Sequence, residues 1–189
     1  MCIRDSIQKL PKQHPLDIKE KGVYLITGGA GGIGMTFACH LAQQYQAKLV
    51  LIGRKPLGDN LRKQLDHILA LDGKAKYFSA DVADMDALQN CIDWAEQHFG
   101  SINGVLHCAG SPGDGLPLRD KSWTRIHEVL NSKVAGSLAL VESFKSRIPD
   151  WIVFCSSASA VVGGAGRADY SSANNFQNAL AQYLSLIHI

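Results

Sequence analysis

The stretch from Val23 to Gly34, Val-Tyr-Leu-Ile-Thr-Gly-Gly-Ala-Gly-Gly-Ile-Gly, constrains the fold of this chain more than any other. An apolar run ends at Thr27, glycines follow, and a helix-forming segment continues to Tyr45, which predicts a strand, a tight turn and a helix. Glycine suits this turn because a missing Cβ lets the main chain approach a pyrophosphate at the positive end of the helix. A mobile glycine loop between two core elements is the alternative. A second apolar strand that ends in Arg54 favours dinucleotide binding.

Composition limits the chain to one domain. Its 189 residues are 46% hydrophobic, enough for one core. The net charge of +2 forms no basic block, so nucleic acid and a membrane surface are not implied. The longest apolar runs have the length of strands, so we expect no membrane span. No spacing suggests a metal site. The odd number of cysteines, without a Cys-x-x-Cys pair, indicates reduced thiols in a cytoplasmic protein: Cys2, Cys39, Cys91, Cys108 and Cys155.

The two ends of the chain do not look native. A single DNA segment, read in opposite directions, can encode both residues 1–6 and residues 184–189, and it resembles the adapter used to prepare sequencing libraries. We expect both hexapeptides to be derived from such an adapter, residues 7–21 to form a polar linker, and residues 22–183 to form one domain. The natural protein is expected to be longer in both directions.

Strand-like and helix-like segments alternate along the domain. The expected strands are residues 23–26, 49–54, 75–80, 102–107 and 151–155, and the expected helices include 35–45, 123–144 and 168–183. Alternation of this kind calls for right-handed crossovers and a parallel sheet with helices on both faces.

Polar or small residues follow each expected strand. They would line the carboxyl edge of the sheet, where open parallel sheets place their ligands. These residues are the turn from Thr27 to Gly34, Arg54, Asp81 with Val82, Cys108 to Gly110, and Ser157. His107 is expected to be a strand-end residue that bonds to the backbone rather than a catalytic one.

The motifs at this edge resemble a known family. Thr-Gly-x-x-x-Gly-x-Gly at Thr27 to Gly34, Ala-Gly after the fourth strand, and Ser157 thirteen residues before Tyr170 are similar to short-chain dehydrogenases/reductases. The resemblance implies a Rossmann-like, doubly wound parallel α/β sheet of about five strands in the order 3-2-1-4-5, truncated at the C-terminus. It also implies cofactor contacts at Thr27, Gly28, Gly29, Gly31, Gly32, Ile33, Gly34, Arg54, Asp81, Val82, Cys108, Ala109 and Gly110.

One departure from the general family pattern narrows the resemblance. The usual Tyr-x-x-x-Lys is replaced by Tyr170-Ser-Ser-Ala-Asn174, and Lys133 stands where the family carries Asn. This exchange resembles the ketoreductase domains of modular polyketide synthases and the related reductases of fatty-acid megasynthases, most closely those synthases whose acyltransferase is a separate protein. Lys121 and Lys145 bracket Lys133 and are alternatives, because most helical lysines are solvated.

The resemblance assigns a role to each catalytic candidate. Tyr170 would protonate the carbonyl oxygen, and Lys133 would stabilise the phenolate left behind, since a free phenol has a pKa near ~10. Ser157 would hold the substrate oxygen, and Asn174 would bond the proton relay. Taken singly, Tyr170 can be a packing residue and Ser157 a cap for the next segment.

The expected function is NADPH-dependent reduction of a β-ketoacyl thioester tethered to an acyl carrier protein, beside other domains of the same megasynthase. Arg54 favours NADPH because a guanidinium pairs with a 2′-phosphate. Asp114, and Val162 in place of a tryptophan, favour a D-configured alcohol. The chain as written is expected to be inactive and prone to aggregation. A free-standing reductase of small ketones and a non-catalytic dinucleotide-binding domain are the alternatives.

Overall fold

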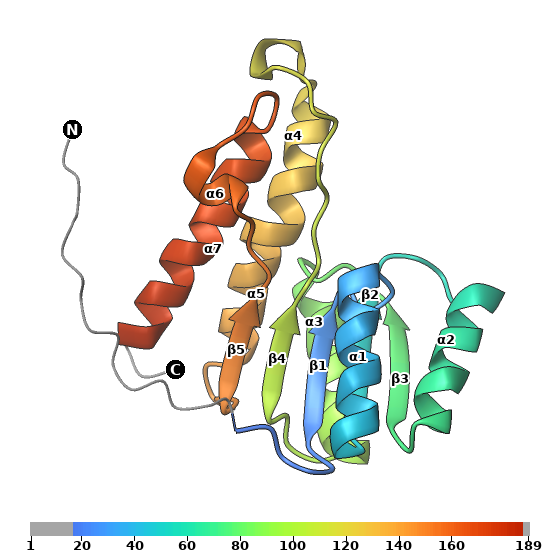
Figure 1. The fold of residues 1–189 in the computed structure, drawn as a ribbon. Helices are drawn as coiled ribbons and strands as arrows, with labels where there is room; N and C mark the ends of the chain where they lie inside the picture. The colour runs from blue at the N-terminus through green and yellow to red at the C-terminus, as the bar shows by residue number, and fades with distance from the viewer. Residues whose placement is uncertain (1–16, 187–189) are drawn as a thin grey trace.

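The computed structural model describes residues 17–186 (Figure 1). The predicted adapter segment 1–6, Cys2, most of the linker and residues 187–189 lie outside that range. The elements are β1 (Val23–Thr27), α1 (Gly32–Tyr45), β2 (Lys48–Gly53), α2 (Asp59–Ala70), β3 (Lys74–Ser79), α3 (Met85–His98), β4 (Gly104–His107), η1 (Leu118–Asp120), α4 (Trp123–Leu130), η2 (Asn131–Ala135), α5 (Gly136–Ser143), β5 (Trp151–Phe154), α6 (Ser159–Val162) and α7 (Ala168–Leu186).

The five strands form one parallel sheet in the order β3-β2-β1-β4-β5. This confirms the predicted doubly wound arrangement. Figure 1 shows α1 and α3 on opposite faces of the sheet. The reversal of strand order at β1 brings the carboxyl ends of β1, β2 and β4 together, and such a switch point is where open α/β sheets bind ligands.

Residues of β1 alternate between two hydrophobic cores. Val23 and Leu25 pack in the core that includes residues of α3 and α5. Tyr24 and Ile26 pack in the core that includes residues of α1 and α2. Successive side chains of a strand point to opposite faces, so a strand buried on both sides needs an uninterrupted apolar run. The apolar run of β1 therefore marks the centre of the sheet.

β5 lies at one edge of the sheet and is less buried than the central strands. Every residue of β1 and β4 is buried, whereas Ile152, Val153 and Phe154 are only half-buried. Stacking of Trp151 on Tyr24, with ring centres 5.5 Å apart, fixes the start of the strand. The side chains after Trp151 keep part of their apolar surface in contact with solvent.

Three local features differ from the predicted elements. The expected helix 123–144 contains a five-residue π-helical segment, Asn131–Ala135, and the expected glycine-rich loop contains the short helix α6. The last helix runs to Leu186, three residues past the expected end, and Leu184 on it is buried. Local periodicity does not reveal an extra residue in a helical turn, because that depends on what the turn packs against.

Candidate active site

The turn after β1 requires glycine at two positions. Gly28 has a φ of 67°, and a Cβ there would lie 2.7 Å from the backbone of Cys108 and Ala109. A Cβ at Gly34 would lie 2.5 Å from the carbonyl oxygen of Gly28. A Cβ at Gly32, the first residue of α1, would meet nothing. The helix N-terminus therefore has an open side with amide groups that can bind an anion.

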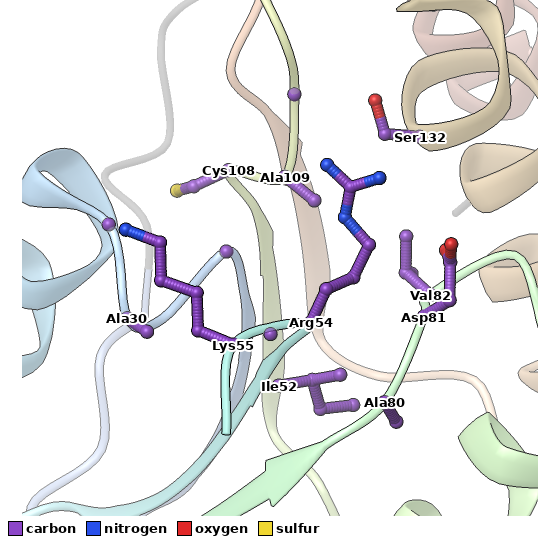
Figure 2. A pocket seen from close by; sticks show the side chains of 14 residues that line it. Ala30, Ile52, Arg54, Lys55, Ala80, Asp81, Val82, Cys108, Ala109 and Ser132 are labelled. Carbon is purple, nitrogen blue, oxygen red and sulfur yellow. The ribbon is translucent and has the colours of Figure 1, made fainter. Parts of the chain in front are cut away.

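A cavity of about 270 Å³ lies between this turn and the ends of the neighbouring strands (Figure 2). Eight of the predicted cofactor contacts line it: Gly28, Gly31, Arg54, Asp81, Val82, Cys108, Ala109 and Gly110. It is also lined by residues that the sequence analysis missed, namely Ala30, Ile52, Gly53, Lys55, Ala80 and Ser132. The sequence contained a signal for Lys55, because this residue directly follows Arg54 and adds a second cation after β2.

Five predicted contacts are not among the residues that line the cavity. Thr27 is fully buried, and its Oγ1 lies 2.6 Å from Nδ1 of His107 and accepts from the amide of Ala109. A Cβ at Gly29 would press against Leu51, so this glycine serves packing against β2. Gly32, Ile33 and Gly34 belong to the first turn of α1, where Ile33 is 62% exposed.

Two cations and one carboxylate define the charge of the cavity. Figure 2 shows the guanidinium of Arg54 extending across the cavity, while the Lys55 side chain points toward Ala30. Asp81 is fixed: its Oδ1 accepts from the backbone N–H of Ala83 at 3.0 Å and its Oδ2 from the side-chain Nδ2 of Asn131 at 3.2 Å. Adjacent exposed cations beside a glycine turn suit a dinucleotide that carries an additional phosphate.

Lys133 is buried next to Gly110, one of the residues that line the cavity. Its side chain sits in the π-helical segment, the residue is 3% exposed, and Nζ donates to the carbonyl oxygen of Cys155 at 2.8 Å and to Oε1 of Gln177 at 3.0 Å. A Cβ at Gly110 would lie 2.9 Å from its Cε, so glycine there makes room for the lysine. Burial lowers the pKa of Lys133 below its usual range.

Tyr170 and Asn174 occupy one face of α7, next to Lys133. The ammonium of Lys133 lies 6.0 Å from the centre of the Tyr170 ring. Asn174 is fully buried, and its Nδ2 donates to the carbonyl oxygen of Tyr170 at 2.7 Å. Its Oδ1 has no hydrogen-bond partner within the described part of the chain. The structure therefore brings Tyr170, Lys133 and Asn174 together from two helices.

Ser157 follows β5 and leads into α6, which packs against α7. Its Oγ accepts from the amide of Ser159 at 3.2 Å and contacts the Ser159 hydroxyl at 3.0 Å. Both contacts are local, and α6 begins after Ala158 without a side-chain cap, so Ser157 does not cap this helix. They leave the hydroxyl hydrogen of Ser157 available to a substrate oxygen when Ser159 is the donor.

The two stereocontrol candidates lie in different environments. Asp114 pairs with Lys121 at 2.6 Å, and Lys121 also pairs with Asp169 at 3.1 Å, directly before Tyr170. The Lys121 side chain is fully buried, so it is not the solvated lysine that its sequence position suggested. Val162, at the end of α6, is 80% exposed. Lys145 is exposed and pairs with Glu142.

His107 is fully buried and close to the side chain of Thr27 rather than only to the backbone. Burial, with a contribution from the charge of Lys133, lowers the pKa of His107 to about 3. The ring is therefore neutral at physiological pH. This fits a structural role at the end of β4.

Other site types find little support within residues 17–186. No group of three metal-binding side chains occurs there, and no helix in this range is long and apolar enough to cross a membrane. Cys39, Cys91, Cys108 and Cys155 are free thiols.

The geometry agrees with comparisons to known proteins. The model of the KR domain family matches residues 22–186. The chain belongs to this family. The expected resemblance to ketoreductases of polyketide synthases is therefore confirmed.

Curated relatives are much longer than this KR domain. Polyketide synthase PksM of Bacillus subtilis is 42% identical over 171 residues, which cover 90% of this chain and 4% of the relative. Polyketide synthase PksL of the same organism is 39% identical over 166 residues, 87% of this chain and 4% of the relative. The chain thus spans about one twenty-fifth of each.

Solved structures show the same fold. An N-terminal ketoreductase from the macrolactin assembly line has a TM-score of 0.85 and 38% identity, covering 89% of this chain and 34% of that one. A ketoreductase domain from the bacillaene assembly line has a TM-score of 0.84 and 36% identity, covering 88% and 40%.

Proposed function

We propose that this KR domain reduces a β-ketoacyl thioester, tethered to an acyl carrier protein, to the β-hydroxyacyl thioester, with NADPH as reductant, as part of a polyketide synthase. The buried ammonium of Lys133 beside the ring of Tyr170 carries the proposal. A non-catalytic dinucleotide-binding domain would have no need to bury a lysine at this position.

One set of residues would bind the cofactor, and another set would handle the proton. The amides at the start of α1 and the small residues from Cys108 to Gly110 would hold the dinucleotide, with Arg54 and Lys55 on its 2′-phosphate. NADPH, when bound, supplies the hydride. The geometry fits this cofactor because the glycine turn has an open side and adjoins a cavity with two exposed cations.

The remaining residues handle the proton. Negative charge develops on the substrate oxygen as the ketone is reduced, so a hydrogen-bond donor and a proton are needed there. Ser157 would donate a hydrogen bond to that oxygen, and Tyr170 would give up its phenolic proton to it. Lys133 stabilises the phenolate that remains. The unpaired Oδ1 of Asn174 is an acceptor that a relay water can bond.

The relatives support the biological setting. PksM and PksL carry the name polyketide synthase, and the two solved ketoreductases come from assembly lines. Such proteins present substrates on carrier domains, so the carrier protein and other domains of one megasynthase are the proposed partners. The free thiols fit a reducing compartment, and we therefore place the enzyme in the cytoplasm.

The assay should use an extended reductase, meaning residues 22–183 within a longer KR domain and without the expected adapter residues 184–189. We expect the 189-residue chain alone to be inactive and to aggregate, because the half-buried side chains of β5 expose apolar surface at a sheet edge. A soluble and active 189-residue chain would contradict this expectation.

The test compares substrates by following NADPH consumption. The extended reductase is given a β-ketoacyl thioester of a pantetheine analogue, the same acyl group on a carrier protein, and a panel of small cyclic ketones. We expect the carrier-bound thioester to have the highest kcat/KM. A clear preference for small ketones would favour the free-standing reductase, and failure to consume NADPH with every substrate would favour the non-catalytic domain.

A further inference from the structure

A fully buried amide holds the lysine of the site. Gln177 is 0% exposed, and its Oε1 accepts from the ammonium of Lys133 at 3.0 Å. Its Nε2 donates to Oγ of Ser137 at 3.1 Å, and that hydroxyl donates to the carbonyl oxygen of Lys133. The bonds form a closed ring from Lys133 through Gln177 and Ser137 back to Lys133.

The ring fixes the direction of the amide. Because Ser137 uses its hydrogen on the Lys133 carbonyl, it accepts from Nε2 and leaves Oε1 to face the ammonium. Gln177 lies seven residues after Tyr170 on α7, two helical turns along the face that also carries Asn174. One helix therefore carries both the proposed acid and the acceptor that holds its charged neighbour.

The burial of Lys133 explains why its ammonium needs such an acceptor. A lysine in that segment that is 3% exposed has lost its water, and an ammonium without partners is costly to bury. Cys155 and Gln177 take two of its three hydrogens. The carbonyl of Cys155 belongs to the backbone and is present whatever the side chain at position 155. Gln177 is therefore the side-chain partner on which the position of the Lys133 ammonium depends.

We propose that Gln177 is a positioning residue that holds the ammonium of Lys133 beside Tyr170. This inference rests on the proposed function. Hydrogen bonding to the charged form favours that form, so Gln177 opposes the effect of burial, which lowers the Lys133 pKa. A charged Lys133 in turn eases the loss of the proton from Tyr170.

Other titratable groups around the lysine must be separated from this effect. They are His107, Cys108, Cys155 and Tyr170. His107 is neutral because burial lowers its pKa. The bond from the Cys108 thiol, with help from Lys133, lowers the pKa of Cys155 to about 7. The titration of Cys155 therefore falls in the working range and needs its own control.

The test is the pH dependence of kcat in the extended reductase. Gln177→Met removes the acceptor with little change of shape, and Gln177→Glu keeps an acceptor and adds negative charge. Gln182→Met is the matched control, because Gln182 is exposed on the same helix. Each profile is repeated in a Cys155→Ala background.

We expect Gln177→Met to lower kcat at neutral pH by about tenfold or more, the effect of one hydrogen bond to a charged group. The alkaline limb of its profile should begin at lower pH, by about one unit, because Lys133 loses its proton more easily without the acceptor. Gln177→Glu should move the alkaline limb the opposite way, and Gln182→Met should match the unsubstituted enzyme.

Two outcomes would overturn the inference. One is a Gln177→Met enzyme with unchanged kcat and profile, and the other is a loss of kcat without any shift, which a purely structural role predicts. If Gln177→Met does not fold or does not bind NADPH, the test rests on Gln177→Glu. An alkaline limb that does not move to higher pH in Gln177→Glu would then contradict the inference. An unsubstituted enzyme that reduces no ketone would instead refute the proposed function.

Discussion

The ammonium nitrogen of Lys133 lies 6.0 Å from the centre of the Tyr170 ring, although the two residues come from different helices. Lys133 belongs to a π-helical segment, and Tyr170 lies near the start of α7. An ammonium at this distance favours the anionic form of a phenol. The proposed roles of Tyr170 as proton donor and Lys133 as its charged neighbour rest on this pair.

Tyr170→Phe removes only the phenolic oxygen. We expect kcat of the extended reductase to fall by about 10²–10⁴-fold, the usual contribution of a positioned general acid. NADPH affinity should stay within a factor of about two, because Tyr170 does not line the cofactor cavity. Tyr183→Phe is the matched control, since Tyr183 is 60% exposed on the same helix. Near-normal turnover of Tyr170→Phe would assign the acid elsewhere.

Lys133→Met removes the ammonium and keeps an apolar stem in the same space. We expect kcat to fall by about a hundredfold, comparable to the loss of one oriented charged donor. Lys145→Met should have no measurable effect, because Lys145 is exposed and pairs with Glu142 at the surface. The measurement is steady-state kcat for both variants with NADPH saturating. Equal activities would remove Lys133 from the mechanism.

Arg54→Ala should weaken NADPH binding by about 10–100-fold, as expected for hydrogen bonds to a charged group. Affinity for NADH should hardly change, since NADH lacks the 2′-phosphate. Fluorescence titration gives both dissociation constants. Lys55→Ala should have a smaller effect in the same direction, and Arg62→Ala, an exposed arginine on α2 outside the cavity, should have none. If the unsubstituted protein binds both cofactors equally, NADPH is the wrong assignment.

Lys121→Met leaves Asp114 and Asp169 facing each other without their cation. We expect a lower free energy of unfolding near neutral pH, measured by denaturant titration. The Lys121 ammonium holds the pKa of Asp114 below its usual range. A depressed carboxyl pKa stabilises the fold above the unfolded value, about 3.9, and this contribution is lost as pH falls through the folded value.

The stability difference between the two proteins should therefore be constant from about pH 5 to about pH 10 and shrink below about pH 4. It should also shrink at higher pH, because the pair raises the pKa of Lys121 and its contribution is lost as that ammonium loses its proton. Lys145→Met, at an exposed pair, is the control and should change stability little. A Lys121→Met variant as stable as the unsubstituted protein would show that the pairs with Asp114 and Asp169 contribute nothing.

The alcohol product should be mainly D-configured. The loop that carries Asp114 is tied through Lys121 to Asp169, directly before Tyr170. Chiral chromatography of the β-hydroxy product measures the ratio. Asp114→Asn weakens the pair with Lys121, so we expect a lower proportion of the D alcohol, whereas Val162→Ala, at an exposed residue, should change the ratio less. A mainly L product from the unsubstituted enzyme would contradict the assignment.

Local patterns were enough to predict the sheet and the residues at its carboxyl edge. The apolar run of β1 and the glycines after it predict a central strand and a helix start, because burial on both faces and a close backbone approach each demand a particular residue type. The alternation of strands and helices then limits the topology. Arg54, Asp81 and Gly110 line the cavity as expected, since each follows the end of a parallel strand.

Contacts between residues far apart in the sequence determined the remaining features of the site. Gln177 bonds to Lys133 across 44 residues of sequence, and Thr27 turns inward to His107 across 80. Neither pattern nor spacing shows a π-helical turn around Lys133, or a buried Lys121 between two carboxylates. Whether a polar residue on a helix is solvated or buried depends on what packs against it. Its burial is favourable only when partners from elsewhere in the chain form its hydrogen bonds. The sequence by itself therefore determined the strands, the glycine turn and the candidate residues, whereas the tertiary structure decided which of their polar groups meet.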